Sequence, residues 1–178
     1  MRGSPCWVFG FEIATNTEDF SLHRTLEYSD RIASVLEVAS GNIHDLENIS
    51  EQNQIGVQYF KAIGKELPSG RVKFSETLQE EIVDLEQNPS HIHVVGPIDF
   101  TAAWTNYVGP PFLHSIGLDK PPSDLNAHSV RQLQDQLFRI TLFEDPFECE
   151  TPENVKRLWQ FREKLRIDET AHKSTGAY

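Results

Sequence analysis

The chain has 178 residues and no apolar run long enough to cross a membrane. A spanning helix needs about 20 consecutive apolar residues. The first 14 residues hold one arginine and an apolar run that glycine and glutamate interrupt. They therefore lack the apolar core and cleavage site of a secretory signal. We expect a cytoplasmic protein that does not bind membranes.

Basic residues are scarce, because 16 Lys and Arg stand against 27 Asp and Glu, which gives a formal net charge of −11. Proteins that bind nucleic acid use clusters of Lys and Arg to neutralise phosphates, and no window of this sequence is basic enough. An acidic balance promotes solubility. It also suits an acidic face that meets a basic protein partner, because complementary fields speed encounter and set specificity.

The familiar catalytic and nucleotide-binding motifs are missing: there is no GxGxxG, GxxxxGK[ST], GxSxG, HExxH, CxxC or EF-hand loop. We expect no cofactor. The only two cysteines, Cys6 and Cys149, lie 143 positions apart. In a chain without an export signal, we interpret them as reduced thiols. Cys149 lies between Glu148 and Glu150, whose charges should raise its pKa and make it a poor nucleophile.

The sequence does contain enough apolar material for one domain, since 38% of its residues are hydrophobic and 11 are phenylalanines. A chain of this length buries roughly 70% of its unfolded surface, so neither a disulfide nor a metal is needed for folding. We predict a single domain over residues 1–178. Residues 1–4 would be vector-derived or disordered, and residues 169–178 a frayed tail.

The apolar patterns predict an α+β fold, in which a small mixed or antiparallel sheet is covered by about four helices. Alternating aromatic residues predict a strand over residues 5–14, and the sheet would also include residues 91–95, with a short strand at residues 71–74. Apolar residues three or four apart predict helices over residues 51–66, 75–88 and 123–140. Ser75 is the expected N-cap of the second helix. A helix over residues 21–28 precedes a segment, residues 31–39, that fits a strand or a helix.

The C-terminal helix has the clearest start signal. Thr151 offers a capping hydroxyl, Pro152 takes the first helical position, and Glu153 places an acid in the first turn. We predict that this helix continues to about Ile167.

Residues 89–118 form the stretch around which the rest of the chain is organised. They contain no Lys, Arg or Glu, one acid, four prolines and three of the seven histidines. This composition predicts a buried strand that leads into a proline-stiffened aromatic loop. Loops on a rigid scaffold often carry function, and Trp and Tyr are favoured interface anchors. We predict that Trp104, Tyr107 and Phe112 anchor a partner; the alternative is that they plug the core.

Two acidic segments would supply the charge for binding. In the predicted helix over residues 75–88, three acids recur every four residues and would share a solvent face: Glu76, Glu80 and Asp84. The second segment, residues 142–150, combines two phenylalanines with four acids, among them Glu144, Asp145 and Glu148.

A different function rests on the histidines. His91 and His93 flank Ile92, so on a strand both side chains face the same side, about 7 Å apart. Such a pair offers two metal ligands, and His114 or Asp99 would supply a third. Asp99 alternatively acts as a general acid tuned by burial, or caps the next segment. In a purely structural role, one histidine caps the strand and the other packs or bonds to a backbone carbonyl.

Two hypotheses follow from these patterns. The leading one is a small acidic protein-binding module, such as an inhibitor or immunity-type protein that blocks a basic protein partner. The alternative is a small-molecule enzyme, metal-dependent or acid–base, that uses His91, His93, Asp99 and His114.

Overall fold

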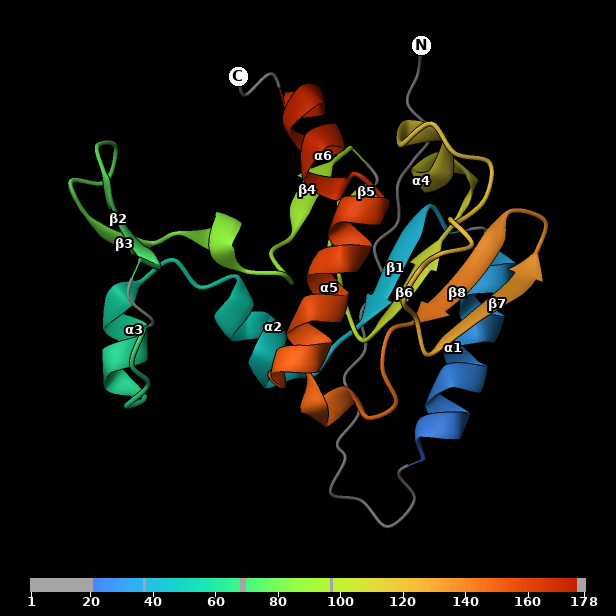
Figure 1. Ribbon diagram of the computed structural model, residues 1–178, viewed down its shortest axis with the longest axis horizontal. Helices are drawn as coiled ribbons and strands as arrows, with labels where there is room; N and C mark the ends of the chain where they lie inside the picture. Colours follow the sequence, from blue (N-terminus) through green and yellow to red (C-terminus); the bar gives the residue numbers. More distant parts are fainter. Residues whose placement is uncertain (1–20, 37, 68–69, 97, 176–178) are drawn as a thin grey trace.

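The computed structural model describes residues 21–36, 38–67, 70–96 and 98–175 (Figure 1). The predicted strand over residues 5–14 and Cys6 lie outside these residues. The described part of the chain forms six α-helices and eight strands, and every strand ladder in it is antiparallel. Four of those helices have seven or more residues. The predicted α+β class and the approximate number of helices are confirmed.

The main sheet has four strands in the order β1-β6-β8-β7. Its strands are β1 (Ser40–Ile43), β6 (Thr105–Val108), β7 (Ser129–Gln134) and β8 (Leu137–Thr141). The two-residue turn between β7 and β8 has Gln136 at φ 58°. A helix was predicted over this segment, because Val130, Leu133, Leu137 and Ile140 are spaced three or four apart. That prediction is wrong, and Val130 and Ile140 pair across the hairpin instead.

Helices cover both faces of this sheet. Side chains alternate along a strand, so neighbouring residues of β6 contribute to different clusters. Tyr107 packs with Ala33 of α1 (Leu22–Leu36). Val108 belongs to the main core, which includes Phe161 of α5 (Pro152–Lys164). The segment over residues 31–39, which fitted a strand or a helix, thus continues α1 as far as Leu36.

The start of α5 is as predicted, since Pro152 is at the first turn and the Thr151 side chain accepts a hydrogen bond from the Asn154 N–H at 3.4 Å. After α5, Arg166 has a positive φ of 50° and turns the chain into α6 (Ile167–Thr175). The prediction of a frayed tail from residue 169 is therefore wrong as far as residue 175. Burial explains the difference, because Ile167 and Ala171 are both 0% exposed.

The predicted helix over residues 75–88 is also wrong, because the chain forms a hairpin of β2 (Val72–Ser75) and β3 (Glu80–Val83). Ser75 Oγ accepts a bond from the Leu78 N–H at 3.2 Å, as an N-cap would. The Gln79 N–H, however, returns to Ser75 O at 2.8 Å, and Gln79 has φ 56°. The capping chemistry is the one predicted, but it closes a turn and starts no helix.

Three further segments complete the described fold. The predicted helix over residues 51–66 is divided at Gly56 into α2 (Leu46–Gln52) and α3 (Val57–Ala62). The predicted strand over residues 91–95 shortens to β4 (His93–Val95), which pairs only with β5 (Ile98–Phe100) and not with the main sheet. Short helical turns are α4 (Pro110–Ser115), η1 (Leu85–Gln87) and η2 (Pro146–Glu148).

Gly109 joins β6 to α4 at a point where two backbone segments meet. A Cβ atom at this position would lie 2.0 Å from the carbonyl oxygen of Val38, so only glycine fits. Its N–H donates to Ala39 O at 3.0 Å. Within the described residues, no helix is both long and apolar enough to span a bilayer.

Candidate functional site

The aromatic residues predicted as partner anchors are buried in the core. Trp104, Tyr107 and Phe112 are 4%, 4% and 2% exposed. The indole N–H of Trp104 donates to Phe143 O at 2.7 Å, and the ring of Phe112 lies 5.1 Å from that of Phe100. The expectation of an exposed aromatic loop is wrong, because these side chains plug the core and have no free surface to offer a partner.

Tyr107 extends to the other face of the sheet and joins it to α1. Its hydroxyl donates to Asp30 Oδ1 at 3.0 Å, and Arg139 donates to Asp30 Oδ2 at 2.8 Å. Burial and the charge of Asp30 raise the pKa of the Tyr107 hydroxyl far above its usual value. Next to this network, α1 and β7 border an open hollow of about 430 Å³ that includes Val35 and Arg131. None of the predicted site residues lines this hollow.

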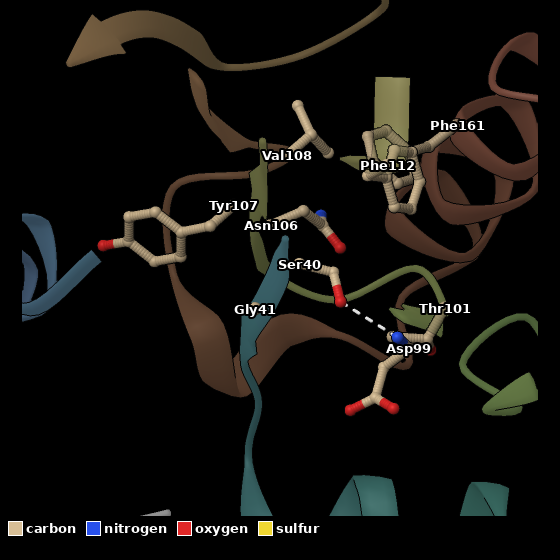
Figure 2. Close-up of a pocket in the computed structure, with 9 residues that line it drawn as sticks. All are labelled: Ser40, Gly41, Asp99, Thr101, Asn106, Tyr107, Val108, Phe112 and Phe161. Atoms are coloured by element: carbon tan, nitrogen blue, oxygen red, sulfur yellow. Dashed lines mark hydrogen bonds between the residues drawn. The ribbon is translucent and has the colours of Figure 1, made fainter. Parts of the chain in front are cut away.

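Asp99 lines a cavity of only about 10 Å³, which Figure 2 shows between β1, β5 and β6. Its backbone N–H donates to Ser40 Oγ at 2.9 Å, and no helix begins after it, so its predicted capping role is wrong. Burial raises the pKa of the Asp99 carboxyl. A cavity needs about 10–15 Å³ to hold one water molecule. The cavity that Asp99 lines therefore has room for about one water molecule.

The two histidines of the His-x-His segment do lie together, with ring centroids 4.5 Å apart. His93 is on β4, and His91 just precedes that strand. Burial, and next the charge of His93, lower the pKa of His91. His91 Nδ1 is buried without a hydrogen-bond partner in the described part of the structure. His114 is an exposed residue of α4 and does not join the described ligand group.

Arg162 of α5 holds the segment that precedes β4. Its side chain is 2% exposed and donates to the carbonyl oxygens of Pro89 and His91 at 3.0 and 2.8 Å. It also forms an ion pair with Asp168 of α6, whose Oδ1 lies 3.2 Å from His93 Nε2. Burial alone would raise the pKa of Asp168, but hydrogen bonds from His93 and Arg162 outweigh it, so the pKa lies well below its usual range.

Two residues that the sequence did not point to complete this cluster. His172 of α6 lies with its ring centroid 5.4 Å from that of His93, and its Nε2 is 3.6 Å from Glu86 Oε1 of η1. Ligand atoms of Glu86, His93 and His172 all lie within 4.8 Å of one another. These residues come from three elements and share no sequence pattern, so only their positions in the fold relate them. We call these three residues the Glu86 cluster.

The first acidic segment lies on the β2–β3 hairpin, which projects away from the main sheet (Figure 1). Glu76 and Glu80 are exposed, as is Glu81. Asp84 is paired instead with Lys73, whose Nζ lies 2.5 Å from Asp84 Oδ1, and this hydrogen bond lowers the pKa of Asp84. Two of the three acids predicted as a helix face thus remain on one exposed feature, although that feature is a hairpin.

In the second acidic segment, Glu144 and Glu148 are exposed on either side of Phe147, which is 53% exposed. Asp145 caps η2, because its side chain accepts a bond from the Phe147 N–H at 2.9 Å. The pKa of the Cys149 thiol is raised to about 11, the direction that the flanking acids predicted, but the main cause is burial, with the nearby acids second.

Compared with models of protein families, with curated proteins and with solved structures, the chain matches none of them.

Proposed function

We propose that this protein is an acidic protein-binding module that docks on a basic protein surface through the β2–β3 hairpin, as an inhibitor or immunity-type protein would. The single observation that carries the proposal is a set of exposed apolar side chains on a hairpin that also carries the exposed acids Glu76, Glu80 and Glu81. Phe74 is 60% exposed, Leu78 50% and Val72 36%. We call these three residues the hairpin patch.

The register of the hairpin gathers apolar and acidic groups on the same face. Phe74 pairs with Glu81, and Val72 pairs with the buried Val83, so all four side chains share one face. Lys73 belongs to the opposite face and is bound to Asp84. A basic partner would thus meet apolar side chains with the carboxylate of Glu81 beside them, and protein interfaces commonly combine an apolar centre with polar groups around it.

The uncovered apolar face and the outer edge of the hairpin also favour the binding of a partner. A two-stranded hairpin is marginally stable in water unless something covers its apolar face. In the described structure β2 pairs only with β3, so its outer edge presents unpaired backbone groups. A partner that covers Phe74, or pairs with β2, supplies the missing burial.

In this proposal the hairpin patch supplies the apolar anchors, in place of the buried Trp104, Tyr107 and Phe112. The register places Glu81 on the face of the patch and Glu80 on the opposite face. Glu76, Glu80 and Glu81 would steer the partner together, because like-signed charges on one exposed hairpin attract a surface of the opposite sign. The net charge of −11 acts in the same direction at long range.

Site-specific crosslinking in lysate of the source cell tests the proposal. A photoreactive residue at Thr77, in the turn of the hairpin, should capture a basic protein. The same residue at Asp135, in the exposed turn between β7 and β8, should not. Capture should weaken at least tenfold in Phe74→Ser and stay unchanged in Val35→Ser, whose side chain is 80% exposed on α1.

A charge-matched pair of variants separates the hairpin from the net charge. Replacement of Glu76, Glu80 and Glu81 by Gln should slow association several-fold at low salt. Replacement of Glu144, Glu148 and Glu150 by Gln changes the net charge equally and should have a much smaller effect. Equal effects of the two triple variants, or capture that does not depend on Phe74, would contradict the proposal.

A further inference from the structure

The Glu86 cluster has the chemistry of a transition-metal site. Two imidazoles and one carboxylate are a ligand set that Zn²⁺ uses in proteins, with the fourth position open to water. The side chains are accessible to an ion from solvent, since His172 is 41% and Glu86 44% exposed, whereas His93 is 12% exposed.

The spacing of the ligand atoms is close to that of a bound ion. At Zn–ligand distances of about 2.0–2.1 Å, tetrahedral ligand atoms lie about 3.3 Å from one another. His172 Nε2 and Glu86 Oε1 are already 3.6 Å apart, and all three ligand atoms lie within 4.8 Å of one another. To close the site, these distances would have to shorten by up to about 1.5 Å, and Glu86, which is 44% exposed, is the ligand least held by packing.

Groups around the cluster support a cation. Metal-bound histidines usually use their second ring nitrogen to donate to a carboxylate, which orients the ring. Asp168 is such a carboxylate, 3.2 Å from His93 Nε2. Arg162, a buried cation, is held by Asp168 and by the carbonyl oxygens of Pro89 and His91.

We propose that Glu86, His93 and His172 bind one Zn²⁺ ion, with Asp168 orienting His93. This ligand set differs from the one that the sequence suggested, because His114 is absent from it and His91 only packs against His93. The ion would join η1, β4 and α6, although Glu86 and His172 lie 86 residues apart in the chain. The proposal is independent of the hairpin.

Calorimetry of the full chain, free of any histidine tag and treated with a chelator, tests the site with Zn²⁺ alone. We expect one ion per chain with a Kd in the low micromolar range or tighter. His172→Gln and Glu86→Gln should each weaken binding at least tenfold. His114→Gln, His23→Gln and His91→Phe should bind within about threefold of the original protein.

Nuclear magnetic resonance provides a readout that does not depend on variants. Addition of one equivalent of Zn²⁺ should shift the ring nitrogen signals of His93 and His172 and leave those of His23 and His114 unchanged. Circular dichroism of each metal-free variant shows whether it folds. The absence of binding at 100 μM Zn²⁺, shifts at His23 or His114, or a tenfold loss in His91→Phe or His114→Gln would overturn the proposal.

Discussion

Replacement of Arg162 by Met should be among the most destabilising single changes in this protein. Methionine keeps an unbranched apolar stem but removes the guanidinium and with it every donor. Two backbone carbonyls, those of Pro89 and His91, then lose their hydrogen bonds at 3.0 and 2.8 Å, and Asp168 loses its ion-pair partner.

The magnitude follows from burial. The Arg162 side chain is 2% exposed, whereas Asp168 is 37% exposed and can be hydrated by solvent. Each buried acceptor left without a donor costs about 1–3 kcal/mol, so the two carbonyls together cost about 2–6 kcal/mol. Loss of the ion pair adds less than the roughly 3–5 kcal/mol of a fully buried pair, because the remaining Asp168 can be hydrated. We therefore expect a loss of about 4 kcal/mol in the free energy of unfolding, or about 8–16 °C in Tm.

Urea unfolding followed by tryptophan fluorescence, with a chelator present, measures this loss. Arg131→Met is the matched control, because Arg131 is 63% exposed and its distance to Asp30 is 3.5 Å. Exposed pairs of this kind contribute about 0–1 kcal/mol. A loss below about 1 kcal/mol in Arg162→Met, or one equal to that of the control, would refute the role assigned to the guanidinium.

Two further predictions concern the backbone and pH. Gly109→Ala should lower the free energy of unfolding in urea by more than about 2 kcal/mol, because its Cβ would lie 2.0 Å from Val38 O. Gly56→Ala is the control and should lower it much less, because the new Cβ would meet only a flexible side chain at 3.3 Å. Equal losses in the two variants would contradict the steric reason. Burial lowers the pKa of His44 from 6.5 to about 4. As the pH falls below 6.5, His44 therefore becomes protonated in the unfolded chain before it does in the folded one. The free energy of unfolding should then fall by up to ~3 kcal/mol as the pH drops to 4. Urea unfolding at several pH values should show a weaker decline in His44→Phe but not in His23→Gln, and a decline unchanged in His44→Phe would rule out this residue as the cause.

The sequence predicted a helix end correctly where capping residues and proline lie at that end. The start of α5 was predictable because Thr151 and Pro152 act within one turn of the helix. The two hairpins were missed because apolar residues three or four apart occur in both structures. In the β7–β8 hairpin, Leu137 and Ile140 belong to strand β8 and are buried there. The turn at Asp135 and Gln136 lacks the glycine that usually marks a two-residue hairpin turn.

The candidate sites were harder to predict than the elements. His91 and His93 are only two residues apart in the sequence, so their proximity was predictable, although the strand itself begins at His93. His172 and Glu86 join them only through packing of α6 on β4, which no local pattern encodes. The aromatic loop was mispredicted as a surface because composition cannot tell whether Trp104 covers the core or faces solvent.

The hydrogen bonds of Arg162 also set an order of events during synthesis. Its partners Pro89 and His91 precede it by 73 and 71 residues. At about 5–20 residues per second, a ribosome needs roughly 4–14 s to cover that interval. During this time the carbonyls of Pro89 and His91 can bond only to water, and the segment before β4 lacks its hydrogen bonds to Arg162. In the nascent chain, the histidines therefore take their final places only after α5 has emerged.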